Sequence, residues 1–316
     1  MEVSAERLRG RFRGALLGVA VGDALGAAYE GTPPELMPPI DVEDLLRGGR
    51  PLRYTDDTHM TLGVAESLVE RRGFDGAHMA SVFVRNFDAE PWRGYGSGPP
   101  RVFRQIERGV PWDEAGRTLF GGSGSFGNGA AMRVAPVALF AFRDASAVDR
   151  LARQTAIITH THELGIEGAV LQAGAVALLL GEEPGGALDP RRLLSALRSR
   201  VSHPIYREKL AAVDALLPDA ARGEVIARLG CGIEAHESVP AALHSFLAHR
   251  DSFADALVAA IGLGGDTDTI GSMAGALAGA YLGEGAIPES WRERVEGADR
   301  LRALADELLL LATAGR

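Results

Sequence analysis

The sequence is poor in cysteine, because Cys231 is the single one among 316 residues. A lone thiol excludes an intrachain disulfide, and it also excludes a zinc site built from several thiolates. A reducing, cytoplasmic setting follows naturally from this scarcity. We therefore expect a cytoplasmic protein whose stability comes from packing.

A positive net charge is also missing. The chain has 33 Lys and Arg against 42 Asp and Glu, which gives 33 − 42 = −9. Such a chain has no bulk attraction for nucleic acid or anionic lipid, and we expect neither as a direct partner. To bind an anionic ligand, the protein would need local groups that attract negative charge, such as metal ions, backbone amides or helix N-termini.

Long hydrophobic runs are absent too. The most apolar run, residues 169–181, is shorter than the roughly 20 residues that span a bilayer, and it predicts a buried core helix. Residues 1–13 carry charges of both signs and do not resemble a signal peptide. With 46% hydrophobic and 24% charged residues, the composition is that of a globular protein with a large core.

Clean period-two alternation is missing, whereas apolar residues recur at helical spacing nearly everywhere, as at Leu62, Ala65, Leu68 and Val69. The breakers between these runs are too short to be interdomain linkers. The pattern predicts an all-α protein that folds as a single domain over residues 1–316, and we expect a monomer.

Two expected helices contain glycine at every fourth position, although each interior glycine costs about 1 kcal/mol relative to alanine. The spacing predicts an offsetting gain from close backbone approach between packed helices; loops are the alternative. The two series are Gly14, Gly18, Gly22 and Gly26, and Gly271, Gly275, Gly279 and Gly283.

Two acidic clusters stand at expected helix starts: residues 55–58 read TDDT, before a helix expected at about 60–71, and residues 266–269 read DTDT. Helix capping alone would explain one side chain in each. Nearly adjacent carboxylates repel one another at neutral pH unless a cation lies between them, so a cation site is favoured. Oxygen ligands without thiolates or grouped imidazoles favour Mg²⁺ or Mn²⁺. His59 is isolated and is not taken as a ligand.

A glycine-rich stretch, residues 121–129 (GGSGSFGNG), precedes an apolar helix expected from 130 to 142. Its backbone amides are able to turn toward a diphosphate, although a simple connecting loop is the alternative. Phe120 and Phe126 bracket the stretch as candidates for stacking on a base; packing into the core is the alternative.

Taken together, the motifs resemble the ADP-ribosylglycohydrolase family, which includes the dinitrogenase reductase activating glycohydrolases and the eukaryotic hydrolases of serine-linked ADP-ribose. Six stretches in family order carry the resemblance: GALLGVAVGDALGAAYEG from Gly14, YTDDTHMTL from Tyr54, GYGSG from Gly94, GSGSFGNGAAMRVAPVAL from Gly122, ITHTHELGIEGAVLQAGAVAL from Ile158 and LGGDTDTIGSMAGALAGAYLG from Leu263.

The resemblance implies a compact orthogonal helical bundle with a binuclear Mg²⁺ or Mn²⁺ centre. Thr55, Asp56 and Asp57 would bind one ion, Asp266 and Thr269 the other, and Asp268 would bridge or neighbour both. Glu30 matches a glutamate on a mobile loop near the metals, and Glu30 or Asp57 would transfer the proton. The implied substrate-binding positions are Gly98, Phe120, Gly124, Ser125, Phe126, Gly127 and His160; the neighbouring His162 departs from the small residue common in the family.

The implied activity is metal-assisted hydrolysis at C1″ of the distal ribose, which releases ADP-ribose from a protein side chain or small acceptor. The Gly94–Gly98 and Gly124–Phe126 stretches tilt slightly toward the serine-linked branch; O-acyl-ADP-ribose is another candidate substrate. One alternative is a non-catalytic ADP-ribose sensor, which the intact acidic clusters disfavour. Another is a prenyl diphosphate enzyme, but no further acid follows Asp56-Asp57 to complete a DDxxD ligand set.

Overall fold

The computed structural model describes residues 4–47, 51–182, 188–217 and 219–314. Over these ranges the chain is helical without a β-strand, which confirms the all-α prediction, and the buried apolar residues form one core. The elements are α1 (Ala5–Gly26), η1 (Pro34–Leu36), α2 (Val42–Arg47), α3 (Asp56–Arg71), α4 (Gly76–Ala89), α5 (Pro99–Glu107), η2 (Ala115–Gly122), α6 (Gly129–Met132), α7 (Ala135–Ala141), α8 (Ala145–Ala156), α9 (Glu163–Gly181), α10 (Pro190–Arg198), α11 (Pro204–Leu216), α12 (Arg222–Leu229), α13 (Ala235–Ala248), α14 (Phe253–Ile261), α15 (Thr267–Leu282), η3 (Glu284–Ala286), α16 (Glu289–Arg294) and α17 (Ala298–Thr313).

The two glycine-spaced helices, α1 and α15, pack antiparallel against each other, glycine to glycine. A Cβ atom added to Gly14 would lie 2.5 Å from the carbonyl oxygen of Gly279, and one added to Gly271 would lie 2.7 Å from that of Gly22. Real Cβ atoms essentially never come that close to a neighbour. The prediction of helices in close backbone contact is confirmed, and the gain in packing offsets the cost of glycine in a helix.

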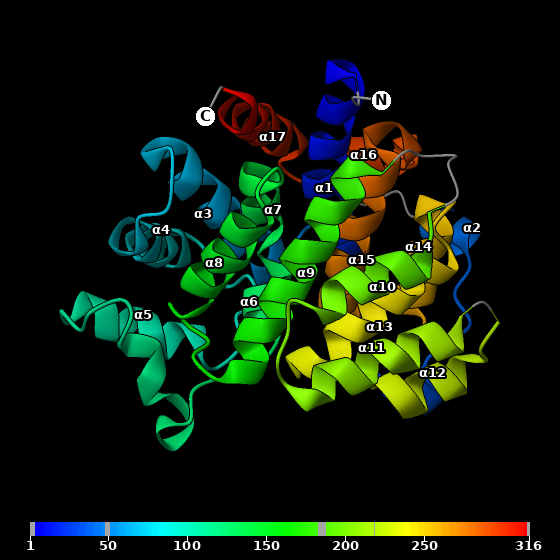
Figure 1. The fold of residues 1–316 in the computed structure, drawn as a ribbon, viewed down its shortest axis with the longest axis horizontal. Helices are drawn as coiled ribbons and strands as arrows, with labels where there is room; N and C mark the ends of the chain where they lie inside the picture. The colour runs from blue at the N-terminus through cyan, green and yellow to red at the C-terminus, as the bar shows by residue number, and fades with distance from the viewer. Residues whose placement is uncertain (1–3, 48–50, 183–187, 218, 315–316) are drawn as a thin grey trace.

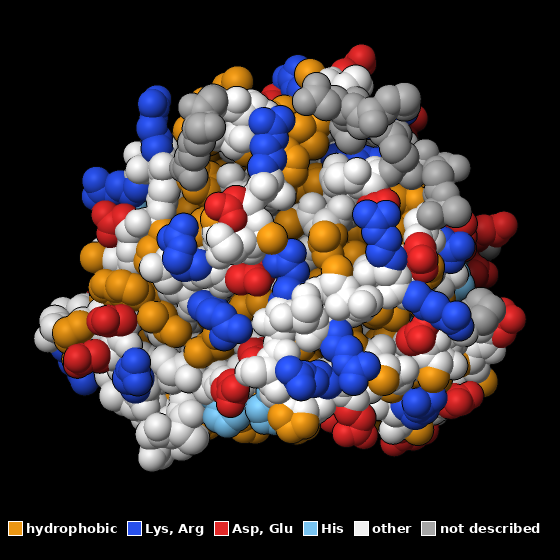
Figure 2. All heavy atoms as spheres, in the orientation of Figure 1, with side chains coloured by type: hydrophobic (Ala, Val, Ile, Leu, Met, Phe, Trp, Pro, Cys, Tyr) orange, Lys and Arg blue, Asp and Glu red, His pale blue; other side chains and the backbone are white. Residues whose placement is uncertain are grey.

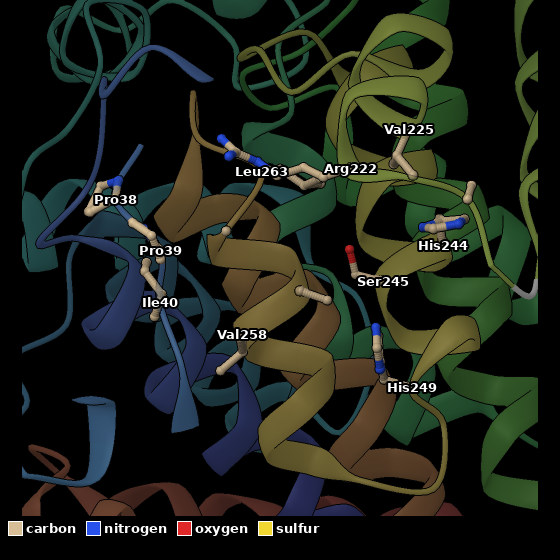
Figure 3. Close-up of a pocket in the computed structure, with 13 residues that line it drawn as sticks. Pro38, Pro39, Ile40, Arg222, Val225, His244, Ser245, His249, Val258 and Leu263 are labelled. Carbon is tan, nitrogen blue, oxygen red and sulfur yellow. The ribbon is translucent and has the colours of Figure 1, made fainter. Parts of the chain in front are cut away.

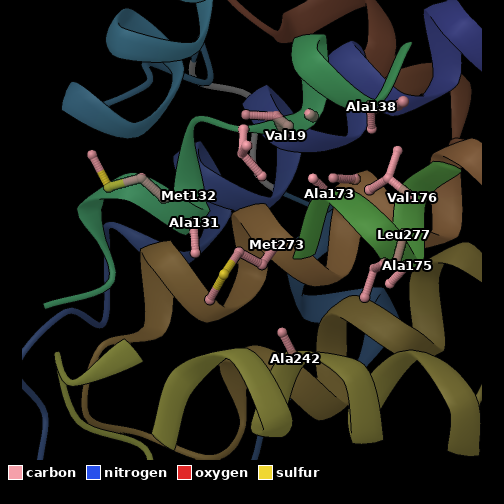
Figure 4. Close-up of a cluster of buried hydrophobic side chains, with 14 of the residues drawn as sticks. Val19, Ala131, Met132, Ala138, Ala173, Ala175, Val176, Ala242, Met273 and Leu277 are labelled. Atoms are coloured by element: carbon pink, nitrogen blue, oxygen red, sulfur yellow. The ribbon is translucent and has the colours of Figure 1, made fainter. Parts of the chain in front are cut away.

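Other helices surround this pair and bury it. Helices α9, α13 and α14 pack on α15, while α17 and α3 pack on α1; Figure 1 shows α9 crossing the middle of the molecule. Figure 4 shows small and branched side chains meeting between these layers, among them Val19 of α1, Val176 of α9 and Leu277 of α15, each fully buried.

Helix α9 contains the apolar run at 169–181, and it is a core helix as predicted. It is the single helix in the described ranges long and apolar enough to cross a membrane, but 83% of its apolar window is buried inside the fold. Its one fully buried acid, Glu167, accepts hydrogen bonds from the amides of Ser202 (2.8 Å) and His203 (3.0 Å). The helix is therefore packed against protein on its sides.

The helix expected from 130 to 142 was predicted wrongly as one piece. The chain forms two short helices instead, α6 and α7, separated at Arg133 and Val134. The physical reason is Pro136, which has no amide hydrogen to donate and whose ring would clash with the preceding turn. At the start of α7 that missing donor costs nothing, because the first amides of a helix have no partner within it.

The surface carries charges of both signs. Figure 2 shows basic and acidic side chains interspersed over the face that it presents. One cluster ties the first helix to the last: Asp306 of α17 accepts paired hydrogen bonds from Arg9 (2.9 and 2.6 Å) and from Arg13 (2.8 and 2.7 Å) of α1. Two guanidinium groups hold the pKa of Asp306 well below its usual range.

Candidate active site

The antiparallel packing of α1 and α15 brings both acidic clusters to one end of the bundle. The beginning of α15 lies beside the end of α1, where the Thr267 hydroxyl donates to the carbonyl of Gly26 at 2.8 Å. In the last two turns of the same α1, Asp23 accepts a hydrogen bond of 2.9 Å from the amide of Thr55, the N-cap of α3. One helix therefore positions the starts of two others.

Asp23 is a buried acid next to the two clusters that sequence reasoning missed. It is fully buried and also accepts from the amide of Thr58 (3.0 Å) and from its hydroxyl (2.5 Å). Burial raises the pKa of Asp23 to about 6, although these hydrogen bonds favour its charged form. The available signal was a lone charge in the apolar stretch between Gly14 and Gly26.

The carboxylates of the two clusters converge with Glu30. Oxygen atoms of Glu30, Asp266 and Asp268 all lie within 4.8 Å of one another, a grouping able to hold a metal ion. The second cluster meets the first where the Thr269 hydroxyl lies 3.5 Å from Asp57 Oδ1. Asp57 Oδ2 is buried, and none of the described residues forms a hydrogen bond with it. A buried carboxylate oxygen without a partner is costly, and this one fits an oxygen ligand awaiting a cation.

The pKa values of the clustered acids also indicate a site for a cation. Burial raises the pKa of Asp56 to about 8, with repulsion from Asp23 adding to it. Burial, with repulsion from Asp266 and Glu30, raises that of Asp268 to about 9. Burial, followed by repulsion from Asp268, raises that of Asp57 well above its ordinary value. These acids resist ionisation together unless positive charge is placed among them, so the donor set fits hard divalent cations.

Asn128, at the end of the glycine-rich stretch, is a second residue that sequence reasoning did not single out. Its side-chain nitrogen donates to Asp266 Oδ2 at 2.5 Å and to the Ser238 hydroxyl at 3.1 Å. Burial raises the pKa of Asp266 to about 6, less than for its neighbours, because the hydrogen bond from Asn128 favours the carboxylate. Asn128 therefore joins the glycine loop to the acidic cluster.

The loop that carries Glu30 is hydrogen-bonded to the loop that carries Asp266. The amide of Gly31 donates to the carbonyl of Gly265 at 2.9 Å, and the amide of Gly265 donates to that of Thr32 at 2.8 Å. Gly265 has a φ of +71°, and a Cβ there would clash with the backbone of Cys231. Glycine is thus required at this crossing of backbones. Glu30 itself is exposed and lines the cavity.

A cavity of about 200 Å³ opens beside the acids. The structure gathers there most of the predicted site residues, and it adds Gly94, Gly96, Ser97, Asn128 and Thr159 to the wall. The predicted site residues that line the cavity are Glu30, Asp56, Asp57, Gly98, Phe120, Ser125, Gly127, His160, Asp266, Asp268 and Thr269.

Three predicted site residues do not line this cavity. Thr55 caps α3, its hydroxyl accepting from the amide of Asp57 at 3.4 Å. Gly124 packs so tightly on Thr161 that a Cβ would clash with it. Phe126 is 43% exposed, and its ring meets that of His162 edge-on with centroids 5.5 Å apart. Their binding roles stay predictions.

Phe120 also lines the cavity. It is 53% exposed and has a φ of +51°, the left-handed region that side chains other than glycine rarely adopt. Its backbone carbonyl accepts from the Ser123 hydroxyl at 2.9 Å, which helps to hold this turn. An aromatic ring kept exposed on a strained backbone suits contact with a planar ligand.

His59, which follows the first acidic cluster, contacts Tyr95 and Glu90. Its Nδ1 atom lies 2.9 Å from the hydroxyl of Tyr95, and its Nε2 atom lies 3.8 Å from Glu90. Burial lowers the pKa of His59 to about 4. The histidine thus joins α3 to the Gly94–Gly98 stretch.

A second cavity, of about 320 Å³, lies elsewhere. Figure 3 shows its wall, with Pro38 and Ile40 facing Arg222, His244 and Val258. None of the described residues that line it has a carboxylate, so they offer no ligand set for a hard cation. The 200 Å³ cavity is therefore the candidate active site.

Comparison with known proteins agrees with this geometry. The family model "ADP-ribosylglycohydrolase" matches residues 4–316. The chain is 37% identical to human ADP-ribosylhydrolase ARH3 (96% of this chain, 94% of the relative) and 30% identical to ADP-ribosyl-[dinitrogen reductase] glycohydrolase of Rhodospirillum rubrum (96% of each). A solved "ADP-ribosylglycohydrolase-related protein complex" superposes with a TM-score of 0.77 at 30% identity, covering 98% of this chain and all of that one. The chain belongs to the ADP-ribosylglycohydrolase family, and it is an ADP-ribosyl hydrolase.

Proposed function

We propose that this enzyme hydrolyses the C1″ glycosidic bond between ADP-ribose and an acceptor, with serine side chains as the favoured acceptor and O-acyl groups as the second. One observation carries the proposal: two acidic helix starts and Glu30 converge on one cavity whose other walls are glycine-rich. Cation ligands on one side and close backbone on the other suit a ligand that has both ribose hydroxyls and a diphosphate.

Two Mg²⁺ or Mn²⁺ ions are the proposed cofactors. Thr55, Asp56 and Asp57 would hold one, Asp266 and Thr269 the other, and Asp268 would neighbour both. The partnerless Asp57 Oδ2 supports this assignment, as do the raised pKa values of Asp56 and Asp268. When bound, such ions orient ribose hydroxyls and stabilise developing charge at the anomeric carbon.

Side chains of the protein would transfer the proton and orient the attacking water. Glu30 is the exposed acid of the cluster, so it can exchange a proton with solvent between turnovers. Asp57 is buried beside Thr269 and better placed as a ligand. We therefore assign proton transfer to Glu30 and orientation to the buried acids.

The far wall would bind the rest of ADP-ribose. Ser125 and Gly127 line the cavity within the glycine-rich stretch, where the Gly127 amide donates to the Ser125 hydroxyl at 3.2 Å. Without side chains at its glycines, this stretch lets a diphosphate approach backbone amides. The exposed ring of Phe120 would stack on the adenine.

A turnover assay tests the proposal. Purified protein with Mg²⁺ or Mn²⁺ is given serine-ADP-ribosylated peptide, arginine-ADP-ribosylated peptide and O-acetyl-ADP-ribose in parallel, with and without chelator. We expect release of ADP-ribose from the serine-linked peptide, lost with chelator. Binding of ADP-ribose without any release would instead establish a sensor, and release from the arginine-linked peptide alone would overturn the acceptor assignment.

A further inference from the structure

Arg133 is fully buried between the core and the cavity. Its guanidinium donates to the carbonyl of Gly129 (2.9 Å), to the carbonyl of Thr155 (3.1 Å) and to the hydroxyl of Thr159 (2.8 Å). A guanidinium has five N–H donors and no acceptor. The Thr159 oxygen is therefore an acceptor in its contact with Arg133, and the hydroxyl keeps its own hydrogen for another partner.

That other partner is His160, whose Nδ1 atom lies 2.7 Å from the Thr159 oxygen. If the hydroxyl donates to Nδ1, both groups are satisfied. If Nδ1 carried the hydrogen, the Thr159 hydroxyl would accept twice and its own hydrogen would have no acceptor among the described residues. Because Thr159 is fully buried, that arrangement is disfavoured. The direction of the hydrogen bonds therefore leaves Nδ1 without a hydrogen.

The ring is neutral in this surrounding. Burial lowers the pKa of His160 to about 3, and the nearby charge of Arg133 lowers it further in the same direction. A neutral imidazole has one N–H, which in this case must be on Nε2.

The Nε2 atom faces the glycine-rich stretch. A Cβ added to Gly129 would lie 3.0 Å from it, and one added to Gly127 would lie 3.6 Å from it. Both glycines line the cavity together with His160. Among the described residues Nε2 has no protein partner, so its hydrogen is available to a ligand.

We propose that Arg133 and Thr159 are positioning residues that fix His160 as the Nε2–H tautomer, so that the ring donates a hydrogen bond to an oxygen acceptor of the bound ligand. Since ADP-ribose is the source of that oxygen, this part rests on the proposed function. A ribose hydroxyl oxygen or a phosphate oxygen satisfies the donor; the protonation state itself is a property of the free protein.

Nitrogen NMR of ¹⁵N-histidine-labelled, ligand-free protein tests the tautomer directly. The His160 signals are identified by their loss in the His160→Gln variant. We expect a pyrrole-like Nε2 and a pyridine-like Nδ1 in the parent protein and in Thr159→Ser, which keeps the hydroxyl. In Thr159→Val, which keeps the shape without the hydroxyl, the bias toward Nε2–H should be lost and the signals of both tautomers should appear.

Calorimetry with ADP-ribose supplies the second readout. Because only the Nε2–H ring donates to the ligand, a roughly equal mixture of tautomers should weaken binding by about twofold in Thr159→Val and leave Thr159→Ser close to the parent. An Nδ1–H ring in the parent protein, or the same nitrogen pattern in Thr159→Val, overturns the inference whatever the activity. The Nε2–H pattern in a protein that neither binds ADP-ribose nor releases it from any substrate would sink the proposed function and leave the tautomer standing.

Discussion

Asp23 Oδ2 accepts both the amide and the hydroxyl of Thr58, so that a single carboxylate near the end of α1 caps the beginning of α3. Replacing Asp23 by Ala leaves these buried donors, and the amide of Thr55, without a partner. We expect the free energy of unfolding to fall by about 3 kcal/mol, measured by urea denaturation. Asp88→Ala, on the exposed surface of α4, serves as the control and should change it by less than about 0.5 kcal/mol. Equal effects would show that Asp23 does not hold α3.

The glycine contact between α1 and α15 predicts a position-dependent response to alanine. A Cβ on Gly18 would clash with the backbone of Gly275, whereas one on Gly10 of the same helix meets nothing within 4 Å. Gly18→Ala should therefore lower the free energy of unfolding by about 3 kcal/mol or prevent folding. Gly10→Ala should be neutral or stabilise by up to about 1 kcal/mol, because alanine favours a helix. Similar denaturation midpoints for the two variants would contradict the packing.

Cation binding predicts a stability change that depends on the acids. Adding Mg²⁺ or Mn²⁺ to chelator-treated protein should raise Tm by mass action, and Asp268→Ala should abolish this rise because Asp268 is central to the cluster. Titration calorimetry should show no ion bound by the variant, while Asp88→Ala binds as the parent does. An unchanged ion content in Asp268→Ala would remove it from the ligand set.

The buried His160 gives a pH dependence whose sign can be worked out. Its pKa in the fold is about 3, below the ordinary 6.5, so the unfolded chain takes up a proton that the folded chain refuses. Its effect is absent above pH 6.5, and stability falls as the pH drops from 6.5 toward 3, by about 1.4 kcal/mol per unit. Between pH 7 and 5, His160→Gln should lose less stability than the parent in urea denaturation. Equal losses would mean that His160 is protonated in the fold.

Two substitutions of Phe120 distinguish the contribution of its ring to binding from the contribution of its backbone conformation to stability. Both Phe120→Ala and Phe120→Gly remove the exposed ring and should raise the Kd for ADP-ribose in calorimetry, about tenfold for one lost stacking contact. Because φ is +51°, glycine should also relieve strain, leaving Phe120→Gly about 1 kcal/mol more stable than Phe120→Ala. Unchanged binding in both variants would remove Phe120 from the ligand site.

Two features of the site could be predicted from the sequence: the regular spacing of glycines and the neighbouring acids of like charge. Glycine at every fourth position indicated two helices in contact, and adjacent acids such as Asp56 and Asp57 indicated a cation. The sequence did not identify Asp23 as the residue that joins α1 to α3, because that contact spans 32 residues along the chain. The break between α6 and α7 was readable at Pro136, but the apolar pattern on both sides concealed it.

The long-range pairings were beyond pattern reasoning for a different reason. Whether Asn128 donates to Asp266, or Arg133 to Thr159, depends on which side chains the fold brings within 3 Å of each other. A sequence motif indicates which residue types are present, but it does not predict which distant side chains they hydrogen-bond to.

The backbone pairing of Gly31, Thr32 and Gly265 has a kinetic consequence. A loop bonded in this way cannot swing aside alone: withdrawing Glu30 pulls on the segment that presents Asp266 and Asp268. If the proposed ions are bound, opening the entrance and loosening them would be a single event, so that the rates at which product and cations leave would rise and fall together.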